Sequence, residues 1–379
     1  MEHSNRAYAV IMTVLFSLFL WFPMVYDALD NSEQDDVSKS ENRNLAVKPY
    51  LDITYVDIFP EQYSAYYNDH FPFREKIIHF FGRNILYGIF GKSPVPDKVV
   101  IGKDGWLFQA ENRPFYSGQV DFTHEEIETI YQKLHERAQY LADRGIDFFL
   151  MIAPMKCEIY PEKLPYFFVR TPGQTRTDKV IERITGDSLI RFIDLKVALT
   201  KVSDSINVYH KTDHHWSTAG GFMVYKEIMH HLYKSYPGIV TLHDTDIFPM
   251  IDSSWCGGLA NMIGLKSEFQ EVRYHYMRKK PKASISEEKK YEPPYWFAYK
   301  DEYEIRTLVA DTSLPSIVVI RDSFFSSLIP FFAESFQTSV YIFDAWMFNT
   351  NYDIILQENP DVVLLEIYEP LLDHLLVSH

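Results

Sequence analysis

Short apolar runs alternate along the chain with stretches of helical periodicity, and this alternation restricts the fold more than any other feature. Continuous apolar runs of this length are typical of strands buried on both faces, and strands that alternate with helices favour a parallel sheet. The sequence therefore predicts an α/β fold with a mostly parallel sheet covered by helices. The expected strands are 148–152, 192–195, 207–209, 317–320, 340–343 and 362–367, and the expected helices are 77–87, 124–144, 177–185, 222–233, 326–336 and 352–358.

Two local signals support this outline. Asp104-Gly105 lies between two apolar runs and predicts a hairpin turn within 98–109. Thr123 followed by Glu126 is a capping-box pattern and predicts the start of the helix at 124.

The N-terminal segment is expected to hold the protein at a membrane. Residues 7–26 are almost wholly apolar, and about 20 apolar residues span a bilayer. Arg6 fits the cytoplasmic side, and Trp21 and Tyr26 fit the outer interface. We find no clear small-residue cleavage site, so an uncleaved anchor over 1–26 is favoured over a removed signal peptide. Either alternative places the rest of the chain outside the cytoplasm.

The remainder divides into a stalk and one large domain. Residues 27–48 are rich in Asp, Asn, Ser and Glu, which is typical of a flexible stalk. We expect a catalytic domain over 49–379, with an insertion near 236–316 where the strand and helix pattern is less regular. Within it, the charged and proline-containing segment 278–294 is expected to be an insertion or exposed hairpin.

Composition excludes some classes of function. The formal net charge of −15 argues against a nucleic acid as the main partner. The aromatic share of 16% suits stacking against carbohydrate, although core packing explains most of these rings. Cys157 and Cys256 are the two cysteines, and no Cys/His zinc spacing occurs. In an exported protein they are either one disulfide or two free thiols.

Two stretches carry side chains suited to acyl transfer. Asp213 and His215 follow one expected strand, and Ser323 follows another. Functional groups of open α/β sheets collect at the carboxyl ends of strands. A serine nucleophile needs an adjacent base, and the base is oriented by a carboxylate. We therefore assign Ser323 as nucleophile, His215 as general base and Asp213 as orienting group, with His214 pointing away in a structural role.

Further residues are candidates for supporting roles. Donors for an oxyanion are the backbone N–H groups of Ser323 and of Gly257 or Gly258, and the side chain of Asn261. Arg321 either binds an anionic substrate group or forms a structural ion pair. Asp322 is expected to hold the turn before the nucleophile.

A metal site is the less favoured alternative for the histidine stretch. Asp213, His214 and His215 carry possible ligand atoms, but the sequence shows no further cluster to complete a site. We therefore expect neither a metal nor a cofactor.

Six short motifs follow one another along the exported part of the chain: 67–74, 102–108, 154–156, 160–165, 213–217 and 321–324. In their order and number they resemble the DHHW family, whose members are SGNH-hydrolase-like proteins related to the alginate O-acetylation proteins AlgX and AlgJ. This resemblance implies a three-layer α/β/α sandwich and a triad of Asp213, His215 and Ser323. One departure is Arg321, which stands where the plain esterase motif has glycine, so no glycine oxyanion contact is expected there.

The resemblance also implies a function. It indicates a membrane-anchored O-acetyltransferase that acts on a cell-surface or secreted polysaccharide, with acetyl groups supplied through a membrane-bound O-acyltransferase. An acetyl esterase with the same triad and a non-catalytic scaffold of a polysaccharide assembly complex are the alternatives.

Overall fold

The computed structural model describes residues 2–29, 46–71, 76–77 and 80–378. These residues form two compact units, one from Met1–Val95 with Met262–Leu265 and one from Pro96–Asn261 with Lys266–His379. The first unit contains the helices α1 (Glu2–Leu29), η1 (Ile53–Tyr55), α3 (Phe59–Asp69) and η2 (Phe81–Tyr87).

The expected membrane anchor falls within α1, a helix of 28 residues. Among the described residues, no helix has both the length and the apolar character needed to cross a membrane. Most of the expected stalk, 30–45, lies outside the described residues, as do positions 78 and 79 of the helix expected at 77–87.

The second unit is built on a seven-stranded sheet with the order β4-β3-β11-β9-β10-β8-β7. The first five strands are parallel, β8 runs antiparallel to β10, and β7 runs antiparallel to β8. The prediction of an α/β fold with a mostly parallel sheet is confirmed. The strands are β4 (Arg191–Ile193), β3 (Asp147–Ala153), β11 (Val362–Tyr368), β9 (Ile317–Arg321), β10 (Thr338–Phe343), β8 (Glu304–Leu308) and β7 (Ser284–Ile285).

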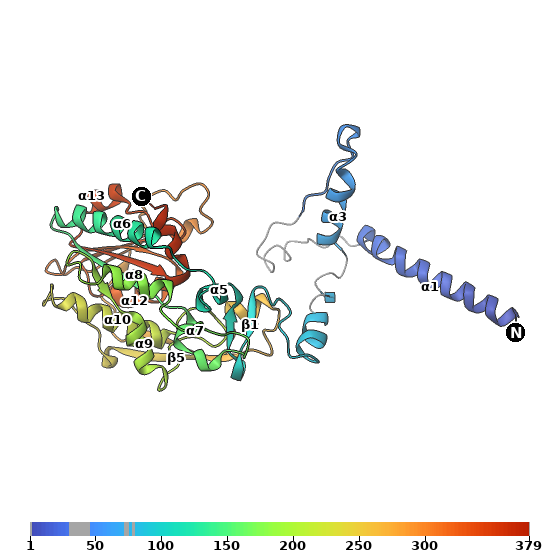
Figure 1. Ribbon diagram of the computed structural model, residues 1–379, viewed down its shortest axis with the longest axis horizontal. Coiled ribbons are helices and arrows are strands. Elements are labelled where there is room, and N and C mark those ends of the chain that lie inside the picture. Colours follow the sequence, from blue (N-terminus) through green and yellow to red (C-terminus); the bar gives the residue numbers. More distant parts are fainter. Residues whose placement is uncertain (1, 30–45, 72–75, 78–79, 379) are drawn as a thin grey trace. The chain divides into compact units, whose positions relative to one another are not determined.

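Helices cover both faces of this sheet, because its central strands carry apolar side chains on both sides. The helices on one face are α9 (Leu195–Ser203), α10 (Thr218–Tyr233) and α12 (Ile329–Phe332). Those on the other face are α6 (His124–Ala142), α8 (Arg176–Ile184) and α13 (Tyr352–Glu358). One core cluster lies on one face of the sheet and joins Phe149, Val319 and Leu364 to α9, α10 and α12. The other lies on the opposite face and joins Val318 and Val363 to α6, α8 and α13. Figure 1 shows α6 and α13 on one side of the sheet and α9 and α10 on the other.

The local signals are also confirmed. Thr123 and Glu126 form both hydrogen bonds of a capping box at the start of α6. The strands β1 (Val99–Ile101) and β2 (Leu107–Gln109) pair antiparallel around Asp104 and Gly105, whose φ angles are 55° and 78°. Positive φ at both positions is what the Asp-Gly signal predicts. Short helices follow this hairpin or lie between the larger elements: η3 (Lys103–Gly105), η4 (Ala110–Asn112), α5 (Arg113–Tyr116), α7 (Lys156–Ile159), η5 (Pro161–Lys163), η6 (Asp244–Asp246), η7 (Lys300–Glu302) and η9 (Glu369–Leu376).

Two expected elements differ in the structure. The strand expected at 207–209 is only one bridge, between Tyr209 and Trp216, because the chain turns back on itself within this short loop. The helix expected at 326–336 is divided into η8 (Ser323–Ser327) and α12. Pro330 lies in the first turn of α12, where its missing N–H costs no helical hydrogen bond.

Residues 236–316 contain more regular structure than their sequence suggests. The strands β5 (Ile247–Trp255) and β6 (Glu271–Arg278) form an antiparallel two-stranded ribbon, and α11 (Gly258–Met262) lies between them in sequence. β7 and β8 join the main sheet.

Candidate active site

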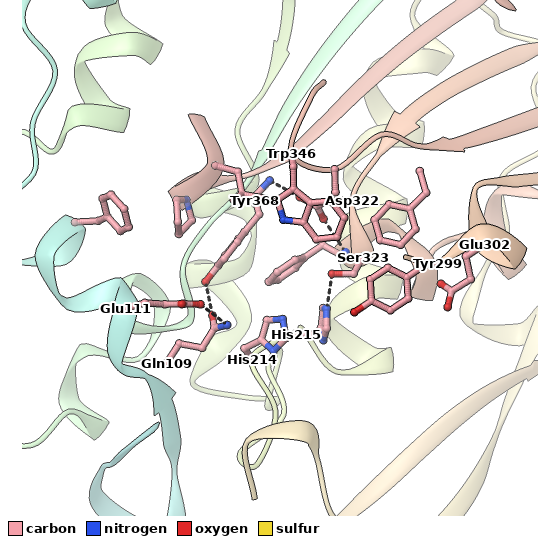
Figure 2. Close-up of a pocket in the computed structure, with 16 residues that line it drawn as sticks. Gln109, Glu111, His214, His215, Tyr299, Glu302, Asp322, Ser323, Trp346 and Tyr368 are labelled. Carbon is pink, nitrogen blue, oxygen red and sulfur yellow. Dashed lines mark hydrogen bonds between the residues drawn. The ribbon is translucent and has the colours of Figure 1, made fainter. Parts of the chain in front are cut away.

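Three side chains from two distant segments form one chain of hydrogen bonds. Ser323 Oγ lies 2.9 Å from Nε2 of His215, and Nδ1 of His215 lies 2.7 Å from Oδ1 of Asp213. An ionised carboxylate only accepts hydrogen bonds, so Nδ1 carries the proton and Nε2 is free to accept from the serine hydroxyl. Figure 2 shows Ser323 directed at the His215 ring. The structure thus brings together the three residues expected to form the triad.

Asp213 is fixed by hydrogen bonds to both of its oxygens. Oδ1 also accepts from the backbone N–H of His215 at 3.0 Å, and Oδ2 accepts from the N–H of Gly258 at 2.6 Å. Burial alone would raise the pKa of Asp213, but the hydrogen bond from His215 and the charges of His215 and His214 outweigh it and lower the pKa. This carboxylate therefore stays ionised and can stabilise a protonated His215. The N–H of Gly258, expected as an oxyanion donor, instead supports Asp213.

A buried lysine holds the backbone of the same loop. Lys156 Nζ donates to the carbonyl oxygens of Leu107, Lys211 and Asp213 at 2.6, 2.8 and 3.0 Å. Burial lowers the pKa of Lys156 to about 7, although the charges of Glu271 and Asp213 oppose this effect. Lys156 lies in one of the motifs that resemble the DHHW family, but its sequence position alone gave no role for it.

A buried carboxylate holds the loop from its other side. Glu271 accepts hydrogen bonds from the N–H of Lys211 at 2.9 Å and from the N–H and hydroxyl of Thr212 at 2.8 and 2.6 Å. Burial raises the pKa of Glu271, but hydrogen bonds from His210 and Thr212 outweigh burial and lower it overall. Glu271 therefore acts as a charged acceptor that ties the loop to β6.

The turn that presents the nucleophile is held by Asp322, as expected. Its Oδ1 accepts from the N–H of Phe324 at 2.8 Å, and its Oδ2 accepts from the N–H of Tyr368 at 2.7 Å. The N–H of Asp322 in turn donates to Oε2 of Glu366 at 2.9 Å. Burial raises the pKa of both carboxyl groups. Since Tyr368 ends β11 and Glu366 lies within it, this strand fixes the turn after β9.

A second contact joins the histidine loop to the serine helix. Trp216 is 1% exposed, and its Nε1 donates to Oγ of Ser327 at 2.6 Å. Phe324 packs between the two segments, with ring centroids 5.0 Å from Trp216 and 4.8 Å from His215. The spacing of base and nucleophile therefore rests on packing as well as on their own hydrogen bond.

A pocket of about 740 Å³ opens onto the Ser323 hydroxyl. Its lining includes both histidine rings, so a bound acyl group would meet the nucleophile and the base in the same cavity. Figure 2 shows the polar and aromatic side chains on either side of Ser323: Gln109 and Glu111 on one side, and Tyr299 and Glu302 on the other, with Trp346 above.

His214 does not point away from the site, contrary to expectation. Its ring lies 3.8 Å from the His215 ring, centroid to centroid, and lines the pocket. Burial and the neighbouring His215 charge lower the pKa of His214 to about 3, so its ring is neutral at pH 7. The loop brings both rings to one side because Asp213 accepts from the His215 N–H and turns the backbone between them.

The same three residues form the metal-like cluster noted in the sequence. One ligand atom from each of Asp213, His214 and His215 lies within 4.8 Å of the others. However, both oxygens of Asp213 and both ring nitrogens of His215 already form hydrogen bonds within the protein. This donor set fits a proton-transfer chain better than an ion site.

The structure places the other candidates away from the pocket. Arg321 is fully buried and donates to the carbonyl oxygens of Asp322 and Glu302 and to Ser326 Oγ, so it braces the turn and does not reach a substrate anion. The Asn261 side chain is exposed on α11 and is not among the residues that line the pocket. The N–H of Gly257 donates to Oγ1 of Thr212 at 2.8 Å. Of the expected oxyanion donors this leaves the N–H of Ser323, since the first N–H groups of a helix lack intrahelical acceptors. Cys157 and Cys256 are free thiols.

Comparison with known proteins places this chain in a family. Residues 99–341 match the model of the SGNH hydrolase-like domain of the acetyltransferase AlgX. The probable alginate O-acetylase AlgJ of Pseudomonas aeruginosa is 31% identical over 130 residues, which cover 32% of this chain and 30% of AlgJ. The chain thus aligns with less than a third of that relative.

Two solved structures share the fold at low sequence identity. PatB1 of Bacillus cereus is 18% identical with a TM-score of 0.54, covering 73% of this chain and 97% of PatB1. A DHHW family protein of Eubacterium siraeum is 14% identical with a TM-score of 0.51, covering 71% of this chain and 89% of that protein. Because the family model matches more than half of the chain, the protein belongs to the SGNH hydrolase-like AlgX acetyltransferase family.

Proposed function

We propose that this protein is an O-acetyltransferase that transfers acetyl groups to hydroxyls of a cell-surface or secreted polysaccharide. The observation that carries the proposal is the hydrogen-bonded chain of Asp213, His215 and Ser323 at the floor of a pocket. Family membership supports acetyl as the transferred group. The similarity to AlgJ, a probable alginate O-acetylase, supports a polysaccharide as the acceptor.

The first half-reaction loads the enzyme. Ser323 Oγ attacks the carbonyl carbon of an acetyl donor while His215 Nε2 takes the hydroxyl proton. We assign the N–H of Ser323 as the donor that stabilises the oxyanion that forms. The intermediate collapses when the bond to the leaving group breaks, and His215 returns the proton to that group. Acetyl-Ser323 remains.

The second half-reaction repeats the same proton transfers with a sugar. A hydroxyl of the glycan attacks the acetyl carbon, and His215 takes its proton. The bond to Ser323 Oγ then breaks, and the proton returns to the serine. Asp213 keeps the charge on His215 stable at both stages, because its lowered pKa keeps it ionised.

The test uses the full chain in detergent solution with 4-nitrophenyl acetate as donor. We expect nitrophenol release, and a 42 Da increase on the peptide that contains Ser323 after rapid acid quenching. Ser323→Ala should abolish both signals, while Ser253→Ala, an exposed serine on β5, should leave them unchanged. Equal turnover by the wild type and Ser323→Ala would remove Ser323 from the mechanism.

The acetyl esterase alternative differs only in the acceptor. Adding oligosaccharides to the same assay separates the two, because a transferase yields acetylated sugar and an esterase yields acetate alone. The scaffold alternative requires no aligned triad, and the distance of 2.9 Å between Ser323 Oγ and His215 Nε2 supports catalysis instead.

We further propose that the domain works outside the cytoplasm, held to the membrane through its N-terminal helix and supplied by a membrane-bound O-acyltransferase. The apolar sequence of 7–26 supports this location. Protease digestion of intact spheroplasts tests it: loss of the C-terminal domain without lysis is expected, and full protection would contradict an outward orientation.

A further inference from the structure

The pocket above Ser323 has a negative electrostatic character. Glu111 and Glu302 are exposed carboxylates on its two sides, and its lining, all within the described part of the chain, includes no lysine or arginine. The basic side chains of Arg321 and Arg176 lie behind the lining, and both are buried and bound to protein oxygens. Arg321 donates to the carbonyl oxygens of Asp322 and Glu302 beneath the turn. Arg176, behind Phe115, donates to Asp373 and to the carbonyl oxygen of Pro370. A ligand that carries carboxylates would therefore meet like charges on both sides of the nucleophile.

An aromatic wall borders the same pocket. The Trp346 ring is stacked with Tyr299, with centroids 6.3 Å apart at 22°, and with Phe343, with centroids 6.4 Å apart at 19°. Trp346 is 41% exposed and Tyr299 is 46% exposed, so ring surface remains open to a ligand. Parallel exposed rings are suited to the apolar C–H faces of pyranose sugars.

The loop that carries Trp346 is held by a buried carboxylate, that of Asp344. Trp346 has a φ of 74°, a conformation that a bulky residue adopts only when its surroundings enforce it. The buried carboxylate of Asp344 accepts from the N–H of Asn349 and from the Asn351 side chain, both at 2.9 Å. The exposed indole is therefore a fixed part of the pocket wall.

The opposite side of the pocket offers fixed hydrogen-bond acceptors. Gln109 Nε2 donates to Glu111 at 3.2 Å, and Gln109 Oε1 accepts from the Tyr368 hydroxyl at 3.1 Å. These bonds restrain Glu111 beside the pocket and leave its second carboxylate oxygen for ligand hydroxyls. Sugar hydroxyls are donors that a carboxylate can accept directly.

We propose that the glycan acceptor is a chain of sugars without carboxylates, which stacks on Trp346 and Tyr299 and donates hydroxyl hydrogen bonds to Glu111 and Glu302. This inference rests on the proposed function and narrows its substrate class. It also separates this protein from the curated relative AlgJ, whose name refers to alginate, a polymer of uronic acids.

A matched pair of ligands tests the proposal. β-1,4-Mannohexaose and β-1,4-hexamannuronate differ in the group at C6, so calorimetric titration of the full chain in detergent without acetyl donor compares charge at constant linkage. We expect mannohexaose to bind at least 10-fold more tightly at 50 mM salt. Glu111→Gln combined with Glu302→Gln should narrow this ratio at least 5-fold by strengthening hexamannuronate binding.

Trp346→Ala tests the stacking surface. We expect it to weaken mannohexaose binding at least 10-fold, whereas Trp296→Ala, which removes another exposed tryptophan that does not line the pocket, should change binding less than 2-fold. Circular dichroism and thermal unfolding of each variant identify any that fail to fold. If Trp346→Ala does not fold, Trp346→Phe takes its place. This variant retains a stacking ring and should bind mannohexaose within 3-fold of the wild type.

Three results would overturn the proposal: equal or tighter binding of hexamannuronate, binding of neither hexasaccharide, or equal effects of Trp346→Ala and Trp296→Ala. Ser323-dependent release of nitrophenol from 4-nitrophenyl acetate needs no glycan. If nitrophenol release depends on Ser323 and one of these three results is found, the proposed acceptor class is wrong but the proposed acyl-transfer chemistry stands. If no Ser323-dependent release is found, the proposed chemistry itself is wrong.

Discussion

The buried Nζ of Lys156 donates a hydrogen bond to the main-chain oxygen of Asp213 at 3.0 Å. Two further carbonyls, those of Leu107 and Lys211, accept from the same nitrogen, so one side chain joins the β2 strand, the histidine loop and α7. Lys156 does not line the pocket. It is therefore a positioning residue, which acts on Ser323 only through Asp213 and His215.

Lys156→Met should lower kcat for 4-nitrophenyl acetate about 10-fold and change KM less than 2-fold. The substitution keeps the apolar stem but leaves three buried carbonyls without their donor, at a cost to stability of about 2 kcal/mol. Urea unfolding and steady-state kinetics measure the two effects. Lys201→Met on the exposed side of α9 is the control, and an unchanged kcat for Lys156→Met would contradict the positioning role.

Asp213→Asn should reduce kcat by about 10³- to 10⁴-fold. Asparagine has one acceptor oxygen and can keep only one of the two backbone hydrogen bonds, from His215 or from Gly258, and its neutral amide neither fixes the Nδ1–H tautomer of His215 nor stabilises the protonated ring. The kinetic loss should exceed that of Lys156→Met. A reduction below 10-fold would show that the carboxylate does not orient the base.

Gly257→Ala should disturb the triad from outside the pocket. A Cβ atom at Gly257 would lie 2.6 Å from Asp213 Cβ and 2.6 Å from the carbonyl carbon and oxygen of Thr212. The loop must move to relieve this contact, so we expect at least a 10-fold loss of kcat. Gly238→Ala is the matched control, because nothing lies within 4 Å of the position that its new methyl group would take. Equal activity of the two variants would refute the tight packing.

Asp322→Ala should lower the unfolding free energy by about 2 kcal/mol and reduce ester turnover at least 10-fold. It removes the acceptor for the N–H groups of both Phe324 and Tyr368, which hold the turn before Ser323. Asp322→Asn retains one acceptor oxygen and should lose less on both measures. Denaturant titration and kinetics compare the pair, and equal losses would mean that the hydrogen bonds do not set the turn.

The loop that carries Trp346 should show its own pH dependence. Burial raises the pKa of Asp344 to about 6, against 3.8 for the ordinary side chain, although hydrogen bonds from Asn351 and Asn349 oppose the shift. Between these pH values the native protein keeps a proton that the unfolded chain has released. The contribution of Asp344 to the unfolding free energy therefore falls as the pH rises from about 4 to 6 and is constant above that range.

Asp344→Asn removes this titration. The stability of Asp344→Asn minus that of the wild type should rise by about 1–3 kcal/mol between pH 4 and pH 7, since each pKa unit is worth about 1.4 kcal/mol. Urea unfolding at four pH values measures the difference. A difference that is flat or falls with pH is the contradicting result.

The sequence predicted those elements whose signal lies within a few consecutive residues. The apolar runs predicted β3, β9, β10 and β11 because buried parallel strands need apolar side chains on both faces. The rule that functional groups collect at strand ends then brought Ser323 and His215 into one hypothesis.

The remaining features depend on contacts between distant segments. β8 was missed because its buried Arg306 forms ion pairs with Glu304 of the same strand and with Glu358, so the sequence of this strand is not apolar. The position of His214 depends on a backbone turn set by Asp213, which adjacent residues alone do not reveal. Gly258 and Lys156 gain their roles only when the loop folds over β2 and α11.

The bonds from His215 to Ser323 and from Trp216 to Ser327 align the base and the nucleophile through contacts within the protein itself. This alignment does not depend on a contact from the glycan. Once Ser323 carries an acetyl group as proposed, water and sugar compete for it at every moment. The fraction of acetyl groups that reaches a sugar then rises with the local concentration of glycan. Transfer is therefore favoured inside a dense polymer layer, and hydrolysis is favoured in dilute solution.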